Sequence, residues 1–252
     1  MNTPPLAAVA AKAKLDPATL EQAFEALKAY ERGSGRAALL PLDTAVAAVQ
    51  NDPPARQTLE QQFLAALKAC SSELAREFIC SKLAWIGSTN SVATLAALLP
   101  DPQLSCAACS ALQAIPDNHA AKALRDSLPK LNSLPKVGVI NSLGARRDAD
   151  SVRVLVRLLK ENDTAVASAA TAALGRIGSV KAAKALRAFQ PKAPPTLQPQ
   201  LADAALACAE QLLNQGRKTE AQALYQMLAA PTQPAHVQSA ASRGLHACSA
   251  KG

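Results

Sequence analysis

The fold of this chain is decided by residues 163–178, which read DTAVASAATAALGRIG. The stretch is rich in Ala and Leu, which favour a helix over a strand because neither is β-branched. Asp163 can accept hydrogen bonds from the free N–H groups of a first helical turn, and Gly178 can adopt the left-handed conformation that ends a helix. The stretch therefore predicts one helix with both ends marked.

A second helix is predicted immediately before this one. Val152, Leu155 and Leu159 are apolar at the spacing that places side chains on one helical face. The polar run Glu-Asn-Asp at 161–163 interrupts the pattern. Residues 150–178 therefore predict a helical hairpin, whose apolar stripe is buried only when neighbouring hairpins cover it on both sides.

The hairpin recurs along the chain in two series of leucines, with a longer last step in each. The first helices share one anchor: Leu95, Leu124, Leu155, Leu186 and Leu224. The second helices share another: Leu83, Leu112, Leu143, Leu174, Leu206 and Leu245. The two series advance together, and a recurrence of this length predicts a stack of helical pairs.

The predicted fold class is all-α, a right-handed α-solenoid of about seven stacked helical hairpins with the first helices on the convex side. We expect an N-terminal tail over 1–19, repeats over 20–189, a proline-rich loop over 190–199, and further repeats of the same solenoid over 200–248. Proline cannot sit inside a helix, so the loop lengthens one connection without ending the stack. Trp85 is expected in the packing between helices.

Three stretches resemble known helical repeats. The pattern D-x-x-V-x-x-x-A-x-x-A-L-G-R-I-G over 163–178 resembles the short HEAT repeat of the phycobilisome-lyase-like class. Residues 136–148 are similar to a group of bacterial HEAT-repeat proteins without an assigned function, and residues 209–225 are similar to a single tetratricopeptide helix turn. The resemblance implies HEAT-like hairpins, ending in a HEAT- or tetratricopeptide-like pair, and the similarity of residues 136–148 names no chemistry.

Composition excludes several classes of protein. Hydrophobic residues make up 49% of the chain but aromatic residues only 3%, which allows a helical core and leaves few strand formers. No apolar run reaches the length of about 18 residues that spans a membrane. The apolar stretch at residues 6–11 is too short for a signal peptide. We expect a soluble protein, cytoplasmic by default and exported if a leader has been removed.

The chemically reactive side chains form no recognisable catalytic motif. Cys106 and Cys109 form a CxxC, but no second CxxC or nearby His completes a zinc site. Cys80 and Cys109 each lie three positions before an anchor, so we expect them to be neighbouring free thiols. The three histidines are expected at surface or capping positions. We therefore predict no catalytic residue, no metal and no cofactor.

Cations concentrate in the middle repeats. Residues 122–192 hold 14 Lys or Arg against 5 Asp or Glu, and the rest of the chain holds 13 against 14. Lys122, Arg153 and Lys184 recur at equal intervals, which predicts a row with one cation per repeat. The candidate anion-binding residues are this row, its extension along one helix and the adjoining loop: Lys122, Arg153, Lys184, Arg157, Lys160, Arg146 and Arg147. The alternative is a solvated convex face that keeps the protein soluble.

These patterns favour a non-catalytic scaffold, a protein–protein interaction module whose partner is another protein with an acidic segment. One alternative is sequence-blind binding of nucleic acid or another polyanion through phosphate neutralisation. Bases would not be stacked, because the basic region holds a single aromatic residue, Phe189. A second alternative, a chromophore lyase or isomerase of the phycobilin type, is implied only by the lyase-type repeat. No oligomeric state is predicted.

Overall fold

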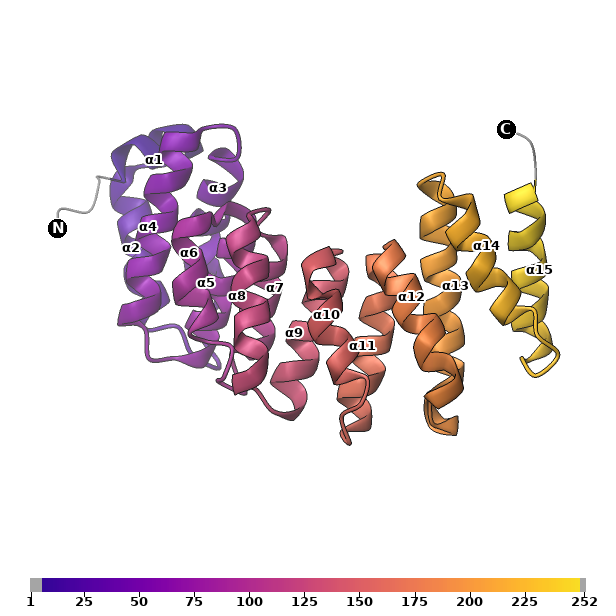
Figure 1. Ribbon diagram of the computed structural model, residues 1–252. Coiled ribbons are helices and arrows are strands. Elements are labelled where there is room, and N and C mark those ends of the chain that lie inside the picture. The colour runs from indigo at the N-terminus through magenta and orange to yellow at the C-terminus, as the bar shows by residue number, and fades with distance from the viewer. Residues whose placement is uncertain (1–5, 250–252) are drawn as a thin grey trace. The chain divides into compact units, whose positions relative to one another are not determined.

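The structure of the chain is a computed structural model that describes residues 6–249 (Figure 1). Fifteen α-helices and five short 3-10 helices follow one another in that range, which contains no strand. The all-α prediction is confirmed. Helices that are close in the chain pack against one another, as a stack of helical repeats requires. Among the same residues, no helix is long and apolar enough to cross a membrane.

The chain divides into two compact units, Met1–Leu131 and Asn132–Gly252, here named unit 1 and unit 2. Each unit is described by itself. The sequence pattern placed residues 20–189 and 200–248 in one solenoid. The continuity of that solenoid across residue 131 and its right-handed sense stay predictions.

Unit 1 holds eight α-helices and two 3-10 helices within residues 6–131. In chain order they are α1 (Ala7–Ala13), α2 (Pro17–Lys28), η1 (Arg36–Leu39), α3 (Leu40–Ala48), α4 (Pro53–Ala69), α5 (Glu73–Ile86), α6 (Thr89–Ala96), α7 (Ser105–Ala114), α8 (Asn118–Ser127) and η2 (Leu128–Lys130). Five of the α-helices begin at a side chain that accepts a hydrogen bond from the first turn: Asp16, Asp52, Ser72, Ser88 and Asp117. These caps explain why the helices start where they do.

The predicted N-terminal tail, residues 1–19, is helical over much of its length. α1 occupies Ala7–Ala13, and α2 already begins at Pro17. Val9 is fully buried, because α1 packs against α3 and α4. The short apolar stretch therefore adds a helix to unit 1 instead of forming a tail. Residues 1–5 lie outside the described residues.

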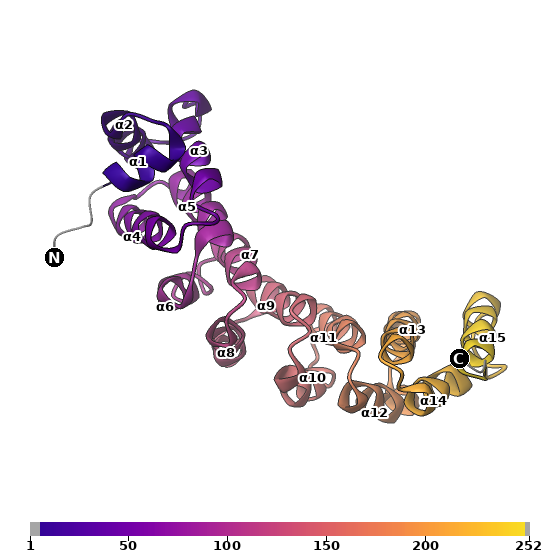
Figure 2. The same ribbon diagram turned by 90° about the horizontal axis from the view of Figure 1, so that it is seen from above.

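Unit 1 is built in two layers of helices (Figure 2). α5 packs against α7 in one layer, and α6 packs against α8 in the other. Contacts between α4 and α5 and between α6 and α7 join the layers into helical pairs. Ile79 and Leu83 of α5 and Leu95 of α6 are fully buried between them. The core of unit 1 is thus the aliphatic seam between its layers.

Unit 2 repeats this arrangement within residues 132–249. Its elements are α9 (Ser133–Ala145), η3 (Ala149–Ser151), α10 (Val152–Leu158), α11 (Thr164–Ile177), α12 (Val180–Phe189), η4 (Gln190–Lys192), η5 (Pro195–Leu197), α13 (Gln198–Asn214), α14 (Lys218–Leu228) and α15 (Ala235–Ser249). α9, α11, α13 and α15 form one layer, here named the second-helix layer (Figure 2). α10, α12 and α14 form the first-helix layer.

The predicted leucine anchors lie in the core with two exceptions. Every first-helix anchor has no exposed surface: Leu95, Leu124, Leu155, Leu186 and Leu224. The same holds for four second-helix anchors: Leu83, Leu112, Leu143 and Leu174. Leu206 and Leu245 are only half-buried, and the buried position is one residue earlier, at Ala205 and Gly244. At Gly244 a small residue is needed, because a Cβ there would overlap the Tyr225 ring.

Two glycines set the spacing of the second-helix layer. A Cβ on Gly144 of α9 would lie 2.8 Å from the Cα of Ala173 in α11. A Cβ on Gly175 of α11 would lie 2.8 Å from the Cα of Ala204 in α13. Both distances are too short for carbon atoms in contact, so only glycine permits this approach. The same close contact therefore recurs one repeat later.

Residues 190–197 of the proline-rich stretch lie between α12 and α13 and fold into two 3-10 turns, whereas Gln198 and Pro199 already belong to the first turn of α13. The side-chain amide of Gln198 donates to the carbonyl oxygens of Gln190 at 3.2 Å and Ala193 at 2.9 Å. These bonds tie the first 3-10 turn to the start of α13. α12 and α13 still pack against each other, so the stretch lengthens a connection inside unit 2.

Candidate functional site

Three of the predicted cations lie on one side of α10 and of the residues that follow it. Arg153, Arg157 and Lys160 are separated by four and three positions, the spacing of side chains on one helical face. All three are exposed. Leu155 and Leu158 point the other way and are buried. α10 therefore turns its leucines to the core and its cations to solvent.

α12 continues this surface in the next repeat. Lys184 is exposed, and so are Lys181 and Arg187, one turn to either side. α12 contacts α10, so Lys184 follows Arg153 on the adjacent helix of unit 2. We name the exposed cations of this surface the basic face: Arg153, Arg157, Lys160, Lys181, Lys184 and Arg187. The predicted row omitted Lys181 and Arg187 because it took one position per repeat, although their spacing from Lys184 signals the same face.

The helices of the basic face contain no acid. The sequences VRVLVRL of α10 and VKAAKALRAF of α12 hold five Lys or Arg and no Asp or Glu. Glu220 of α14 lies near Lys184: its pKa is lowered first by the Arg217 guanidinium that donates to it, and less by the charge of Lys184. Residues 132–252 hold 15 Lys or Arg against 7 Asp or Glu, and residues 1–131 hold 12 against 12. The whole formal excess of +8 therefore arises in unit 2.

Lys122 lies in α8 of unit 1. It is exposed and its ammonium donates to Asp126 one turn later. Two positions beyond it, Leu124 is fully buried, as the repeat predicts. Because Lys122 belongs to the other unit, its place in one row with Arg153 and Lys184 stays a prediction.

Arg146 and Arg147 lie at the C-terminal end of α9, in the second-helix layer. Arg146 is half-buried, and Arg147 is exposed with φ +52°. Arg147 borders a hollow of about 320 Å³ together with Arg176 of α11 and Glu210 of α13. The structure thus brings Arg147 together with Arg176, which the predicted site did not include, and not with the basic face of the opposite layer.

Comparison with known families finds a similarity over the segment that carries the basic face. Residues 129–198 match the family model of HEAT repeats. This part of the chain is therefore similar to HEAT repeats. The matched segment, here named the HEAT segment, contains α9 to α12 and therefore the whole basic face. No curated protein sequence matches the chain.

Outside the HEAT segment, the position of Trp85 corrects a prediction. The side chain is 69% exposed near the end of α5 instead of packed between helices. Residue 85 follows the buried anchor Leu83 by two positions, which places it on the far side of the helix. Phe78 lies two turns earlier on the same side, and its ring is 6.4 Å from that of Tyr30 and 4.5 Å from Nζ of Lys82. Unit 1 therefore has an exposed tryptophan on the same helix as a cation–aromatic contact.

The cysteines and histidines of residues 6–249 form no cluster that could hold a metal ion. None of the six cysteines forms a disulfide bond, and no group of three or more His, Cys, Asp or Glu is placed to hold a metal ion in that range. Cys80 and Cys109 are buried on α5 and α7, which pack together. Burial raises the pKa of the Cys80 thiol to about 11, which makes it a poor nucleophile at neutral pH. Cys106 is exposed.

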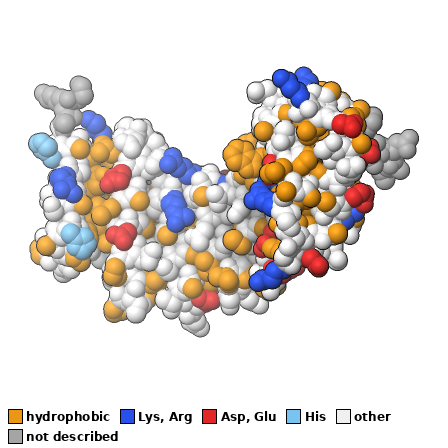
Figure 3. Space-filling view, turned by 180° about the vertical axis from the view of Figure 1, so that it is seen from behind, with side chains coloured by type: hydrophobic (Ala, Val, Ile, Leu, Met, Phe, Trp, Pro, Cys, Tyr) orange, Lys and Arg blue, Asp and Glu red, His pale blue; other side chains and the backbone are white. Residues whose placement is uncertain are grey.

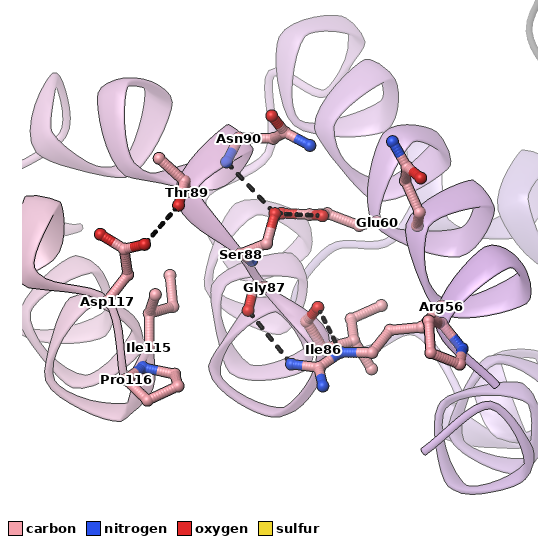
Figure 4. A pocket seen from close by; sticks show the side chains of 12 residues that line it. Arg56, Glu60, Ile86, Gly87, Ser88, Thr89, Asn90, Ile115, Pro116 and Asp117 are labelled. Carbon is pink, nitrogen blue, oxygen red and sulfur yellow. Dashed lines mark hydrogen bonds between the residues drawn. The ribbon is translucent and has the colours of Figure 1, made fainter. Parts of the chain in front are cut away.

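Unit 1 also has a hollow of about 390 Å³, where α4 meets the turns before α6 and α8 (Figure 4). Glu60 of α4 is only 1% exposed. Its carboxylate accepts from the backbone N–H of Ser88 at 2.7 Å and from the hydroxyl of Ser91 at 2.5 Å. One turn earlier, Nε of Arg56 donates to the carbonyl oxygen of Ile86 at 2.9 Å. α4 thereby holds the turn between α5 and α6.

The next turn is joined to this one by a second polar contact. The Thr89 hydroxyl donates to the Asp117 carboxylate at 2.6 Å (Figure 4). Asp117 also accepts from the backbone N–H of His119 at 2.6 Å, and these donors, Thr89 first, lower the pKa of Asp117 to about 2. The charged groups of this hollow are thus bonded to the chain itself, so we interpret it as a structural junction.

Proposed function

We propose that the chain is a non-catalytic scaffold that holds another protein, and that an acidic segment of this partner docks on the basic face. The observation that carries the proposal is the basic face itself, an exposed group of cations on two contacting helices of the HEAT segment that contain no acid. Stacked helical repeats present extended surfaces that serve as scaffolds for partners. Complementary charge would add association rate and specificity.

An acidic protein segment fits this surface better than a nucleic acid does. Base stacking needs exposed aromatic side chains, and the one aromatic residue of α10 and α12, Phe189, is only 9% exposed. Glu220 lies near Lys184, so its negative charge would repel the successive phosphates of a nucleic-acid backbone. A protein segment can place its carboxylates at intervals that avoid Glu220.

The chromophore lyase alternative gains no support from the two hollows described above. A tetrapyrrole would require an apolar cleft with aromatic walls. Neither the hollow beside Arg147 nor the hollow beside Glu60 is lined by an aromatic side chain of the described residues. We therefore propose a scaffold and not a lyase.

The test is a basic-face variant that combines Arg153→Glu, Arg157→Glu and Lys184→Glu. The wild-type chain, immobilised, is used to capture a protein from native lysate. Capture should weaken steeply as salt rises, since exposed charges are screened over about 10 Å at 0.1 M. The variant should keep the helical circular dichroism and melting temperature of the wild type, because these side chains are exposed, and should lose the partner.

The matched control changes the same number of exposed cations outside the basic face: Arg32→Glu, Lys68→Glu and Lys130→Glu. It has the same net charge as the basic-face variant and should keep the partner. Lys122→Glu alone then shows whether unit 1 contributes to binding. Undiminished, salt-insensitive capture by the basic-face variant would contradict the proposal. Capture that nuclease treatment abolishes would favour the nucleic-acid alternative.

A further inference from the structure

The hollow at the ends of α9, α11 and α13 lies on the layer opposite the basic face. It encloses about 320 Å³, and its walls include Gly144, Arg147, Gly175, Arg176, Glu210 and Gln211. We name it the arginine hollow. Figure 3 looks onto this side of unit 2 and shows blue and red side chains separated by apolar and uncharged ones. The charges here are few and individually placed, unlike the cations of the basic face.

Two guanidinium groups of the arginine hollow are available to a ligand. Arg147 and Arg176 are exposed, and neither forms an ion pair with an acid of residues 6–249. Glu210 is the one acid among the described residues of the wall, so the hollow carries one positive charge in excess. Planar guanidinium groups donate paired hydrogen bonds that match the two oxygens of a carboxylate.

Arg147 has a backbone conformation that glycine supplies in the following repeats. α9, α11 and α13 each end in a left-handed residue: Arg147 with φ +52°, Gly178 with φ +59° and Gly216 with φ +74°. α9 and α13 also end in the same hydrogen-bond pattern. The N–H groups of Arg147 and Gly216 each donate to the carbonyl oxygen three positions earlier.

A side chain is costly in this conformation, because Cβ comes too close to the following carbonyl oxygen. Glycine would close α9 without that cost, as it closes α11 and α13. Backbone strain of this kind concentrates at functional sites. Arg147 instead places a side chain at the border of the arginine hollow, which glycine could not do.

We infer that the arginine hollow binds an acidic peptide segment, with one Asp or Glu side chain held between Arg147 and Arg176. The carboxylate of Glu210 and the side-chain carbonyl oxygen of Gln211 then face the peptide backbone and can accept hydrogen bonds from its N–H groups. A nucleic-acid backbone fits less well, because successive phosphates would approach Glu210. The site goes beyond the proposed function, since it lies on the other layer and can be tested without the basic face.

The test follows the arginine side-chain N–H resonances of the ¹⁵N-labelled full chain by NMR. The protein is the basic-face variant, in which the competing surface has lost its charge. The probe is a tetraglutamate peptide blocked at both ends. We expect the resonances of Arg147 and Arg176, assigned by substitution, to shift together, to saturate, and to return towards their starting positions as salt is added.

Two substitutions separate a shaped site from simple attraction. Arg176→Lys keeps the charge but loses the paired donors, and Arg147→Gly removes the side chain and the strain together. Each should weaken peptide binding about tenfold, the effect of one lost charged hydrogen bond. Arg147→Gly should also raise the melting temperature. Lys14→Gly is the matched control, because Lys14 ends α1 with φ +54°. Its melting temperature should rise and its affinity for the peptide should stay unchanged.

Several outcomes would overturn the inference. One is a titration in which the Arg147 and Arg176 resonances do not move. Another is an unchanged affinity in both arginine variants, which would show that the peptide binds elsewhere. A larger shift with duplex DNA than with the peptide would assign the hollow to nucleic acid instead. Loss of the lysate partner in the basic-face variant leaves this titration unaffected, so the two proposals fail separately.

Discussion

Glu60 accepts hydrogen bonds from both the backbone N–H and the hydroxyl of Ser88, at 2.7 Å and 2.8 Å, although the two residues are far apart in the sequence. Ser88 in turn accepts from the N–H of Asn90 and so caps α6. A nearly buried carboxylate of α4 therefore orients the residue that starts a helix of the next pair. This relationship ties two repeats together through polar groups in addition to their apolar seam.

Glu60→Ala should destabilise unit 1 by about 2–4 kcal/mol, because Ser88 and Ser91 lose their buried acceptor. Urea denaturation followed by circular dichroism measures the change. Glu21→Ala removes an exposed carboxylate of the same unit and should change the free energy of unfolding by less than about 0.5 kcal/mol. Equal effects of the two substitutions would show that the contact of Glu60 with Ser88 contributes nothing to stability.

Gly175→Ala should destabilise unit 2 by about 1–3 kcal/mol, because the added Cβ overpacks the contact between α11 and α13. That atom would lie 2.7 Å from the carbonyl oxygen of Ala204. Gly35→Ala is the control, since a Cβ there meets nothing within 4 Å and φ is −69°. It should be neutral or slightly stabilising. The melting temperatures of both variants test this prediction. An unchanged melting temperature in Gly175→Ala would contradict the close packing of α11 and α13.

Trp85, the single tryptophan of the chain, should emit like a tryptophan in water and be quenched freely by acrylamide, because its side chain is 69% exposed. Trp85→Ala should cost less than about 1 kcal/mol, as expected for a side chain outside the core. Phe63→Ala, at a fully buried position, should cost about 3–5 kcal/mol. A blue-shifted, protected emission would show that the side chain is covered in solution.

Stability should fall as pH rises from about 9 to 11. Burial raises the pKa of Cys80 to about 11 and that of Cys208 to about 12, from an ordinary value of 9.0. In this window the unfolded chain releases thiol protons that the folded chain keeps, so the free energy of unfolding decreases with pH. Cys80→Ala with Cys208→Ala should flatten this decrease in chemical denaturation at pH 8, 9, 10 and 11. An equally steep decrease in the double variant would exclude the two thiols as its cause.

The sequence by itself determined the helical pairs and most of their core. Apolar spacing of about 3.6 residues, one helical turn, specifies which face of a helix is buried. The regular return of a leucine in each hairpin specifies which faces meet. Leu155 and Leu174 could be assigned to the core on this basis, and both have no exposed surface. Local signals sufficed here because each pair contacts its neighbours in the chain. The cations of α10 were predictable for the same reason, as the face opposite the leucines.

Only the tertiary structure decided where small residues replace the leucine anchors and which polar groups meet. Ala205 takes the buried position assigned to Leu206. The close approach of Gly175 in α11 to Ala204 in α13 is likewise a property of two helices together. Glu60 and Ser88 look like ordinary surface residues until α4 and the turn before α6 are adjacent. Arg147 shares a hollow with Arg176 only because α9 and α11 end side by side. Periodicity describes one helix at a time, whereas these contacts depend on the spacing and register of several helices.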